Sequence, residues 1–441
     1  MPNLSRVPIF CSHEHWGSID SIGAVEGGFR ADMERGAVPD RDTGLMDILL
    51  DPYFRGMLAS GGEDLDGWAR QAKAASFHDW AHERPSEAYE ALRPALEREQ
   101  LTGTFQCIRR GLADLYDVDI MQVSTSSWLA LDEAICRNYS RVFQWYLEVM
   151  KRAAFSELIR PVHPEFYLHD ATNEAARLEA SFTHSVMRID PLLTFWKEEC
   201  PRRDTLEQTL GVVPRDAASW RRFIGTLLDL AAAKGAVGIK QLQAYKRSLE
   251  FLPVEDKDVA WTGALDGGQV RVFEDWVVHE CCRQADDRGW AHQIHTGTHN
   301  LTQSSPMPLA ALAKRYGKQK IVLLHCWPYT REAGWLAKYH PNVYLDTCWM
   351  PILNPVFLRD ALESWLSYVP SNKVMAGNDA TSVEMAVGAS LFTREIVTEA
   401  LAGQSHRLGL KPDALHRVAQ AFLNDNAVAV YGIGEHTDQT I

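Results

Sequence analysis

Two histidines separated by one residue stand near the amino terminus of this chain. His13 and His15 directly follow the apolar stretch at residues 7–11, which has the composition of a short buried strand. Side chains two residues apart on an extended chain point to the same side, so both imidazoles could bind one metal ion. Such a pair often occurs by chance, and its meaning depends on what the rest of the sequence supplies.

Further polar residues stand at the ends of other apolar stretches. His295 and His325 end two of them, Lys240 ends a third, and Asp379 follows a fourth. The carboxyl ends of strands are where barrel enzymes build their active sites. Several imidazoles and a carboxylate suit Zn²⁺, with Mn²⁺ as the alternative. We therefore predict a metal site in which these histidines and Asp379 meet. Lys240 needs a partner as well, because a charged side chain at the end of a buried strand is costly without one.

Alternating strands and helices must position these side chains. Apolar and β-branched stretches predict eight strands, at residues 7–11, 119–123, 185–189, 236–239, 291–295, 320–325, 342–346 and 373–376. Helical spacing of apolar residues separates the later strands, as at residues 216–234, and such alternation implies a parallel sheet. Eight parallel strands favour closure, so we predict an α/β fold, a (β/α)8 TIM barrel that spans residues 1–441 as one domain.

One long segment interrupts this alternation. Between Gly17 and Gln100 no strand–helix unit is evident, although residues 86–100 have a helical pattern. We predict a largely helical insertion after the first strand, over residues 17–100, part of which covers the active site as a lid. The alternative is a peripheral helical subdomain that does not reach the site.

Composition excludes several classes of protein. The net charge of −13 argues against nucleic-acid binding and against docking on anionic membranes, since both need a surplus of Lys and Arg. No stretch is long and apolar enough to span a membrane, and the first residues lack the apolar core of a signal peptide. The eight cysteines form no CxxC pair, so neither a zinc knuckle nor a disulfide scaffold is indicated. We expect a cytoplasmic protein that binds a small molecule and forms a homo-oligomer.

The strand-end motifs resemble those of the amidohydrolase superfamily, of the amidohydrolase-2 type. The branch they resemble is related to nodulin and to domains fused with glutamine synthetases. The motifs that carry this resemblance are GIKQLQAYKRSL (238–249), QIHTGTHN (293–300), VLLHCWPY (322–329), NVYLD (342–346) and KVMAGNDA (373–380). The resemblance covers nearly the whole chain and is weakest over residues 17–100.

The resemblance implies roles for the strand-end residues. The metal ligands it implies are His13, His15, Lys240, His295, His325 and Asp379. Asp379 would also shuttle a proton, and His325 would belong to the catalytic group. Lys240 matches the lysine that carries a carbon dioxide adduct and bridges two ions in the two-metal subtype. The alternative role for Lys240 is an unmodified ammonium that binds a substrate carboxylate beside a single ion. The number of metal ions, one or two, is therefore left open.

Substrate identity cannot be taken from relatives, because the loops depart from the family pattern. Thr298, His299, Asn300, Lys246 and Asn378 replace the family's residues. The residues we expect to contact substrate are Arg188, Tyr245, Lys246, His299 and Trp327. Arg188 could hold a carboxylate in bidentate fashion, but it could equally form a structural ion pair with Asp190.

These inferences predict a metal-dependent hydrolase that uses an activated water on an amide C–N bond of a small, carboxylate-bearing substrate. The first alternative is a non-hydrolytic member of the same superfamily, either a decarboxylase or a uronate-type isomerase. A binding protein that has lost catalysis is the second alternative, and the complete set of five histidine and aspartate ligands argues against it.

Overall fold

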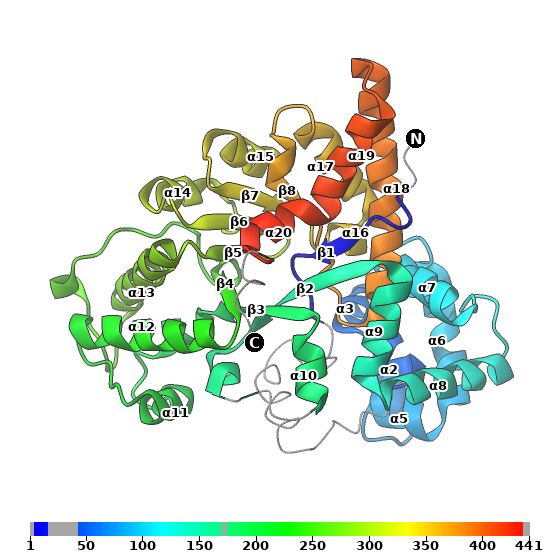
Figure 1. Ribbon diagram of the computed structural model, residues 1–441. Helices are drawn as coiled ribbons and strands as arrows, with labels where there is room; N and C mark the ends of the chain where they lie inside the picture. Colours follow the sequence, from blue (N-terminus) through cyan, green and yellow to red (C-terminus); the bar gives the residue numbers. More distant parts are fainter. Residues whose placement is uncertain (1–3, 16–42, 169, 171–173, 435–441) are drawn as a thin grey trace.

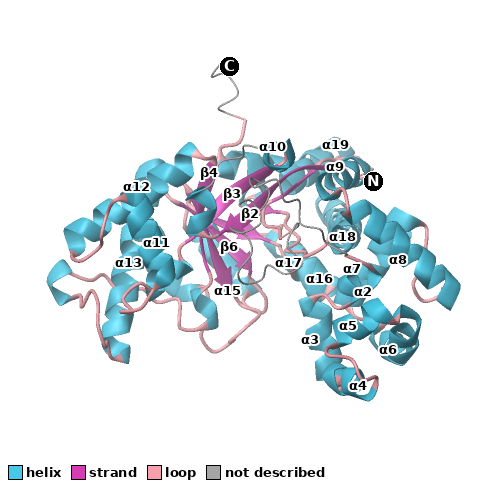
Figure 2. Ribbon diagram, turned by 90° about the horizontal axis from the view of Figure 1, so that it is seen from below, coloured by secondary structure: helices cyan, strands magenta, loops and turns pink. Residues whose placement is uncertain are grey.

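Eight parallel strands form one sheet in a computed structural model that describes residues 4–15, 43–168, 170 and 174–434. The strands pair with their neighbours in sequence order, and they occupy the centre of the molecule (Figures 1 and 2). They are β1 (Ile9–Cys11), β2 (Phe155–Val162), β3 (Thr183–Arg188), β4 (Ala236–Gln241), β5 (Ala291–Thr296), β6 (Lys320–His325), β7 (Val343–Asp346) and β8 (Val374–Met375). The predicted (β/α)8 barrel is confirmed.

Backbone hydrogen bonds join the two ends of the sheet just beyond β1 and β8. The N–H of Ser12 donates to the carbonyl of Ala376 at 3.1 Å, and the N–H of Asp379 donates to the carbonyl of His13 at 3.0 Å. The segments that carry the first and last predicted ligands are therefore neighbours, although more than 360 residues separate them. Inside the ring, apolar side chains from several strands form a separate core, which includes Phe10, Ile159, Val186, Ala291, Val322 and Met375.

Helices follow the strands around the barrel. They are α10 (Glu174–Ala180), α11 (Pro201–Leu210), α12 (Ala217–Ala233), α13 (Gly267–Arg288), α14 (Ala310–Arg315), α15 (Thr330–Tyr339), α16 (Met350–Leu353), α17 (Pro355–Trp365), α18 (Val383–Leu408), α19 (Pro412–Gln420) and α20 (Asn426–Tyr431). The start of α12 shows how the sequence indicates where a helix begins. The side chain of Asp216 accepts a hydrogen bond from the N–H of Ser219 at 2.8 Å, which satisfies one of the free donors of the first turn.

A layer of helices lies between β1 and β2 in the chain. It comprises α2 (Leu45–Leu49), α3 (Pro52–Ser60), α4 (Leu65–Gln71), α5 (Phe77–Glu83), α6 (Pro85–Glu99), α7 (Gly103–Tyr116), α8 (Thr125–Tyr139) and α9 (Val142–Ala153). Residues 17–42 of the predicted insertion lie outside the described residues. The helical layer extends past residue 100 to Ala153, beyond the boundary that the sequence indicated.

The prediction of a second strand at residues 119–123 is wrong. This segment connects α7 to α8, and Ile120 is buried among the helices while its carbonyl accepts a hydrogen bond from the hydroxyl of Tyr89. The true second strand is β2, whose pattern is interrupted by Arg160. Arg160 is buried in β2 because it forms an ion pair with the buried Glu179, and a sequence pattern does not show such a partner.

The helical layer packs on the barrel through α7 and α18. A Cβ at Gly388 would lie 1.8 Å from the carbonyl oxygen of Cys107, so glycine at this position allows the two helix backbones to touch. The buried carboxylate of Glu384 accepts hydrogen bonds from Tyr116 at 2.8 Å and from Tyr139 at 2.7 Å. Because α18 follows β8 directly, the layer is fixed beside the end of the barrel that carries Asp379. Among the described helices, none is long and apolar enough to cross a membrane.

Candidate active site

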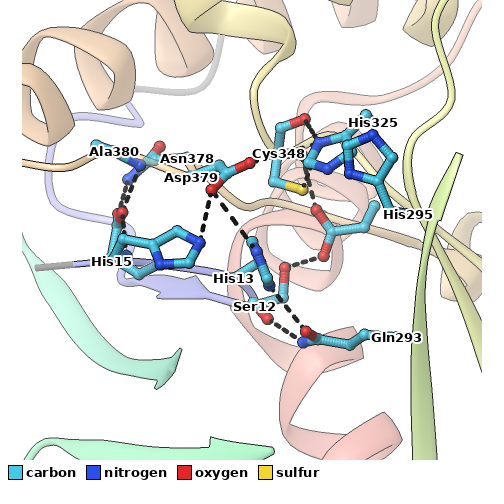
Figure 3. A network of polar contacts seen from close by, with 12 residues as sticks. Ser12, His13, His15, Gln293, His295, His325, Cys348, Asn378, Asp379 and Ala380 are labelled. Atoms are coloured by element: carbon cyan, nitrogen blue, oxygen red, sulfur yellow. Dashed lines mark hydrogen bonds and ion pairs between the residues drawn. The ribbon is translucent and has the colours of Figure 1, made fainter. Parts of the chain in front are cut away.

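The carboxylate of Asp379 lies among three of the predicted ligands. Its Oδ1 is 3.1 Å from Nε2 of His15 and 3.6 Å from Nε2 of His13, and its Oδ2 is 3.7 Å from Nδ1 of His325. Figure 3 shows the carboxylate between the residues after β1 and the histidine that ends β6. The structure therefore brings together side chains that belong to opposite ends of the sequence.

The orientation of His13 is set by Gln293 on β5. The amide nitrogen of Gln293 donates to the carbonyl of Ser12 at 2.8 Å and to the hydroxyl of Tyr431 at 2.7 Å. Its amide oxygen therefore faces Nδ1 of His13, 2.8 Å away, and must accept a hydrogen bond from it. With the proton on Nδ1, Nε2 of His13 carries a lone pair. Within the described part of the chain this buried Nε2 makes no hydrogen bond.

His295 and His325 complete the group from the ends of β5 and β6. Their ring centroids are 4.3 Å apart, and both side chains are buried. Nδ1 of His325 lies 3.1 Å from the carbonyl of Cys348, which can only accept, so the proton is on Nδ1 and Nε2 holds the lone pair. Nε2 of His295 is 3.1 Å from the hydroxyl of Thr298.

Burial keeps the imidazoles neutral. It lowers the pKa of His13 and of His295 well below the ordinary value, and it lowers the pKa of His325 to about 4. Burial acts in the opposite direction on Asp379, but the neighbouring His13, His15 and His325 hold the pKa of this carboxyl well below its usual range. Neutral imidazoles and an ionised carboxylate are the protonation states that metal ligands require.

Lys240 is buried in the same region, at the end of β4. Its side chain is almost wholly shielded from solvent, and it pairs in register with Gln293 on β5. Its positive charge further lowers the pKa of His13, His295 and His325. The charge of Lys240 thus lies near these histidines, and its role as a metal ligand stays a prediction.

These donors fit a divalent metal ion. Two groups each have ligand atoms within 4.8 Å of one another, one made of His13, His15 and Asp379, and the other of His325, Cys348 and Asp379. Imidazole nitrogen and carboxylate oxygen are preferred ligands of Zn²⁺ and similar cations. The buried Nε2 of His13, which has no hydrogen-bond partner among the residues that the structure describes, is the atom that such an ion would satisfy.

The backbone around the site is held in an uncommon conformation. His325 has a φ of 64°, Cys326 of 60°, Trp349 of 69° and Asp379 of 61°. Left-handed backbone at residues other than glycine costs roughly 1–3 kcal/mol each and is concentrated at functional sites. The barrel thus maintains strained turns at the strand ends that present these side chains.

The residues expected to contact substrate have varied surroundings. The ring of Tyr245 lies 4.4 Å from that of His295 and 4.7 Å from that of His299. The guanidinium of Arg188 lies 3.7 Å from the carboxylate of Asp190, which fits the alternative of a structural ion pair. Lys246 is exposed. The ring of Trp327 stacks on Phe357 at 4.1 Å. Substrate binding by these residues stays a prediction.

Two aromatic residues border the site and were not indicated by the sequence. Trp349, after β7, has its ring 5.3 Å from that of His325 and 5.2 Å from that of His299. Tyr53, in α3, contacts Trp349 at 4.9 Å and places its hydroxyl 3.5 Å from Oδ1 of Asp379. Neither residue lies at the end of an apolar strand, which is the signal that indicated the other site residues. For Tyr53, only the pattern of apolar residues in the helical layer could have drawn attention to it.

Comparison with solved structures supports the fold over the whole chain. A glucuronate isomerase from Caulobacter crescentus matches with a TM-score of 0.74 and 16% identity, covering 98% of this chain and 93% of that one. A protein from Lactobacillus casei, provisionally described as a metal-dependent hydrolase, matches with a TM-score of 0.62 and 17% identity over 98% of both chains. At these identities the likeness shows the fold.

Sequence comparison identifies the family. The protein fluG of Emericella nidulans is 28% identical over 334 residues, which cover 66% of this chain and 36% of fluG. The chain therefore spans about a third of the length of this relative. The profile of the family described as amidohydrolase matches residues 209–433, the part of the chain that holds strands β4 to β8. This match extends over half of the sequence and contains four of the six predicted ligands, and the chain belongs to the amidohydrolase family.

Proposed function

We propose that this protein is a metal-dependent hydrolase that cleaves an amide C–N bond of a small, carboxylate-bearing substrate. The observation that carries the proposal is the convergence of neutral imidazoles from β1, β5 and β6 on the ionised carboxylate of Asp379. One or two zinc ions, or manganese in their place, would be held by His13, His15, Lys240, His295, His325 and Asp379. We further propose that the protein works as a cytoplasmic homo-oligomer.

The chain's own residues supply the proton transfers. A bound divalent cation lowers the pKa of water and polarises a carbonyl oxygen. Asp379 accepts the proton that the attacking water loses, because its carboxyl is ionised and lies at the centre of the site. It then delivers this proton to the leaving nitrogen. His325, on the opposite side of the carboxylate from His15 (Figure 3), orients Asp379.

Lys240 is proposed to carry a carbon dioxide adduct. Its neutral amine would form an N–C bond with carbon dioxide and release one proton, which gives an anionic carbamate with two ligand oxygens. An anion at this buried position would balance the cation charge, whereas an ammonium would repel it. If Lys240 carries this adduct, Lys240→Ala should reduce both metal content and activity, and added short carboxylic acids should restore part of each.

The fold likeness to a glucuronate isomerase over almost the entire chain supplies a second candidate, a metal-dependent isomerase or decarboxylase of acidic substrates. Here Lys240 would stay an ammonium beside a single ion and hold a substrate carboxylate. The buried position of Lys240 among the histidines suits this role as well. The two candidates differ in whether water is consumed.

The deciding experiment combines metal analysis with isotope incorporation. Protein purified without added metal is analysed for zinc and manganese, and it is then screened against N-acyl and side-chain amides of acidic amino acids and against uronic acids in ¹⁸O-water. The hydrolase proposal expects bound metal, chelator-sensitive turnover and one ¹⁸O atom in the new carboxylate. Conversion of a uronate with no water incorporated into a carboxylate would replace it with the second candidate. Metal-free protein that neither Zn²⁺ nor Mn²⁺ activates would contradict both.

A further inference from the structure

A second group of metal-ligating side chains lies on the helical layer, outside the active site. His78 and His82 belong to α5, and Asp47 belongs to α2. All three offer ligand atoms within 4.8 Å of one another. Helices α2 and α5 lie side by side in both views (Figures 1 and 2). The group thus joins two helices of the layer.

The geometry of the group directs three donors to one point. His78 and His82 are four residues apart, so their side chains lie on the same face of α5. Their Nε2 atoms are 3.1 Å apart. Oδ1 of Asp47 lies 2.8 Å from Nε2 of His78, and Oδ2 lies 3.6 Å from Nε2 of His82. Without an ion, His78 is within hydrogen-bond distance of both Asp47 and His82, and the ligand atoms of the three residues are close enough to bind one ion together.

Charge and exposure around the group favour a cation. Asp132 on α8 interacts electrostatically with both Asp47 and His82, and its pKa is raised, first by burial. The side chain of His78 is 60% exposed and that of His82 is 35% exposed, whereas Asp47 is only 10% exposed. The donors are thus reachable from solvent, and the carboxylate is fixed by its packing.

We propose that His78, His82 and Asp47 bind a late first-row divalent cation such as Zn²⁺, Ni²⁺ or Cu²⁺. Imidazole donors select this part of the series. The site is separate from the active site, since its ligands come from α2 and α5 and form a group that shares no residue with the two groups around Asp379. By joining α5 to α2, the ion would fix α2, whose last residue, Leu49, stands two positions before Asp51 and four before Tyr53. The role proposed is structural: the ion holds the segment that brings Tyr53 to Asp379.

The test compares metal binding of full-length variants. Metal-stripped wild-type protein and the double variant H78A/H82A are equilibrated with Zn²⁺, passed through a desalting column and analysed for bound zinc. The site predicts one equivalent fewer in H78A/H82A. The matched control is H406A/H416A, which removes two exposed histidines from α18 and α19 and should keep the wild-type stoichiometry. His13→Ala should lose active-site metal but retain the equivalent held by His78 and His82. Loss of metal from the active site can therefore be distinguished from loss of metal from the group on α2 and α5.

Copper spectroscopy provides an independent measurement. One equivalent of Cu²⁺ added to the His13→Ala variant should give an electron paramagnetic resonance spectrum with coupling to two nitrogens, and H78Q/H82Q in the same background should lose this spectrum. The two proteins should melt at the same temperature when metal-free, and Cu²⁺ should raise the melting temperature only where His78 and His82 are present. Asp47→Asn should weaken the affinity about tenfold or more, because it replaces a charged ligand by a neutral one. Equal zinc content in wild type and H78A/H82A, or a copper spectrum that survives H78Q/H82Q, would overturn the proposal.

Discussion

The side-chain oxygen of Gln293 lies 2.8 Å from Nδ1 of His13, and this contact determines which nitrogen of the imidazole can bind a metal. Gln293 cannot turn its amide around, because its nitrogen already donates to the carbonyl of Ser12 and to Tyr431. The proton of His13 is therefore held on Nδ1, and Nε2 faces Asp379. Partners of this kind fix the tautomer and the ring orientation of metal-binding histidines.

Replacing Gln293 should weaken metal binding without removing a ligand. In Gln293→Met the side chain keeps its length but accepts no strong hydrogen bond, so the ring of His13 is free to rotate and to change tautomer. We expect metal affinity to fall roughly 10–100-fold, as is typical for the outer partners of ligands. A competition titration with a chromophoric chelator measures it. Tyr431→Phe removes a different hydrogen bond of Gln293 and should leave the affinity near that of wild type; equal losses in both variants would refute the role assigned to Gln293.

Asp379→Asn should separate chemistry from metal binding. Asparagine retains the shape and one ligating oxygen, but it cannot accept a proton near pH 7. Turnover should fall by a factor on the order of 10² or more, while metal content and melting temperature stay close to those of wild type. His13→Ala should instead lose metal first and activity as a consequence. Near-native turnover of Asp379→Asn would move the proton transfer to another group, such as His325 or His299.

Tyr53→Phe tests whether the helical layer takes part in the reaction. The hydroxyl of Tyr53 lies 3.5 Å from Oδ1 of Asp379, and its removal should lower kcat/KM about tenfold through lost contacts in the transition state. The metal content should not change. The control is Tyr339→Phe, whose ring is exposed on α15. Wild-type kinetics for Tyr53→Phe would show that the layer reaches the site without contributing to it.

Asp51 should make stability decrease with pH. Burial, opposed by hydrogen bonds from the backbone of Tyr53 and Phe54 and reinforced by Asp379, raises the pKa of Asp51 from 3.8 to about 7. The folded protein then binds this proton more tightly than the unfolded chain does, so stability falls as pH rises from about 4 to about 7. Asp51→Asn keeps an acceptor at the start of α3 and has no charge to bury. Its melting temperature, relative to that of wild type, should rise by on the order of a few degrees over this range in metal-free protein.

The opposite sign is expected at another helix start, which gives a matched control. Hydrogen bonds from the N–H and hydroxyl of Ser219 lower the pKa of Asp216. Its carboxylate therefore stabilises the protein at neutral pH, and this contribution is lost as pH falls through the lowered pKa. The advantage of wild type over Asp216→Asn should shrink toward acid pH. If both variants shift in the same direction with pH, burial is not what distinguishes Asp51.

The barrel and most of the residues grouped around Asp379 could be predicted from local sequence patterns. Seven of the eight predicted strands overlap strands of the structure, because each is a short apolar run whose signal is local. His295 and His325 could be found for the same reason: a polar residue that ends such a run lies at the carboxyl end of a strand, whatever the rest of the chain does. The first parallel strand and the last were also expected to meet, since a closed barrel requires it.

Three features depend on long-range packing and had no local signal: the second strand, the extent of the helical layer and the aromatic border of the site. Arg160 within β2 is stable in the interior through Glu179, and a strand that depends on such a partner has no clear pattern of its own. Tyr53 reaches Asp379 across 326 positions of sequence. Such contacts depend on how segments far apart in the chain pack together, and that packing is a property of the folded chain that no local run of residues contains.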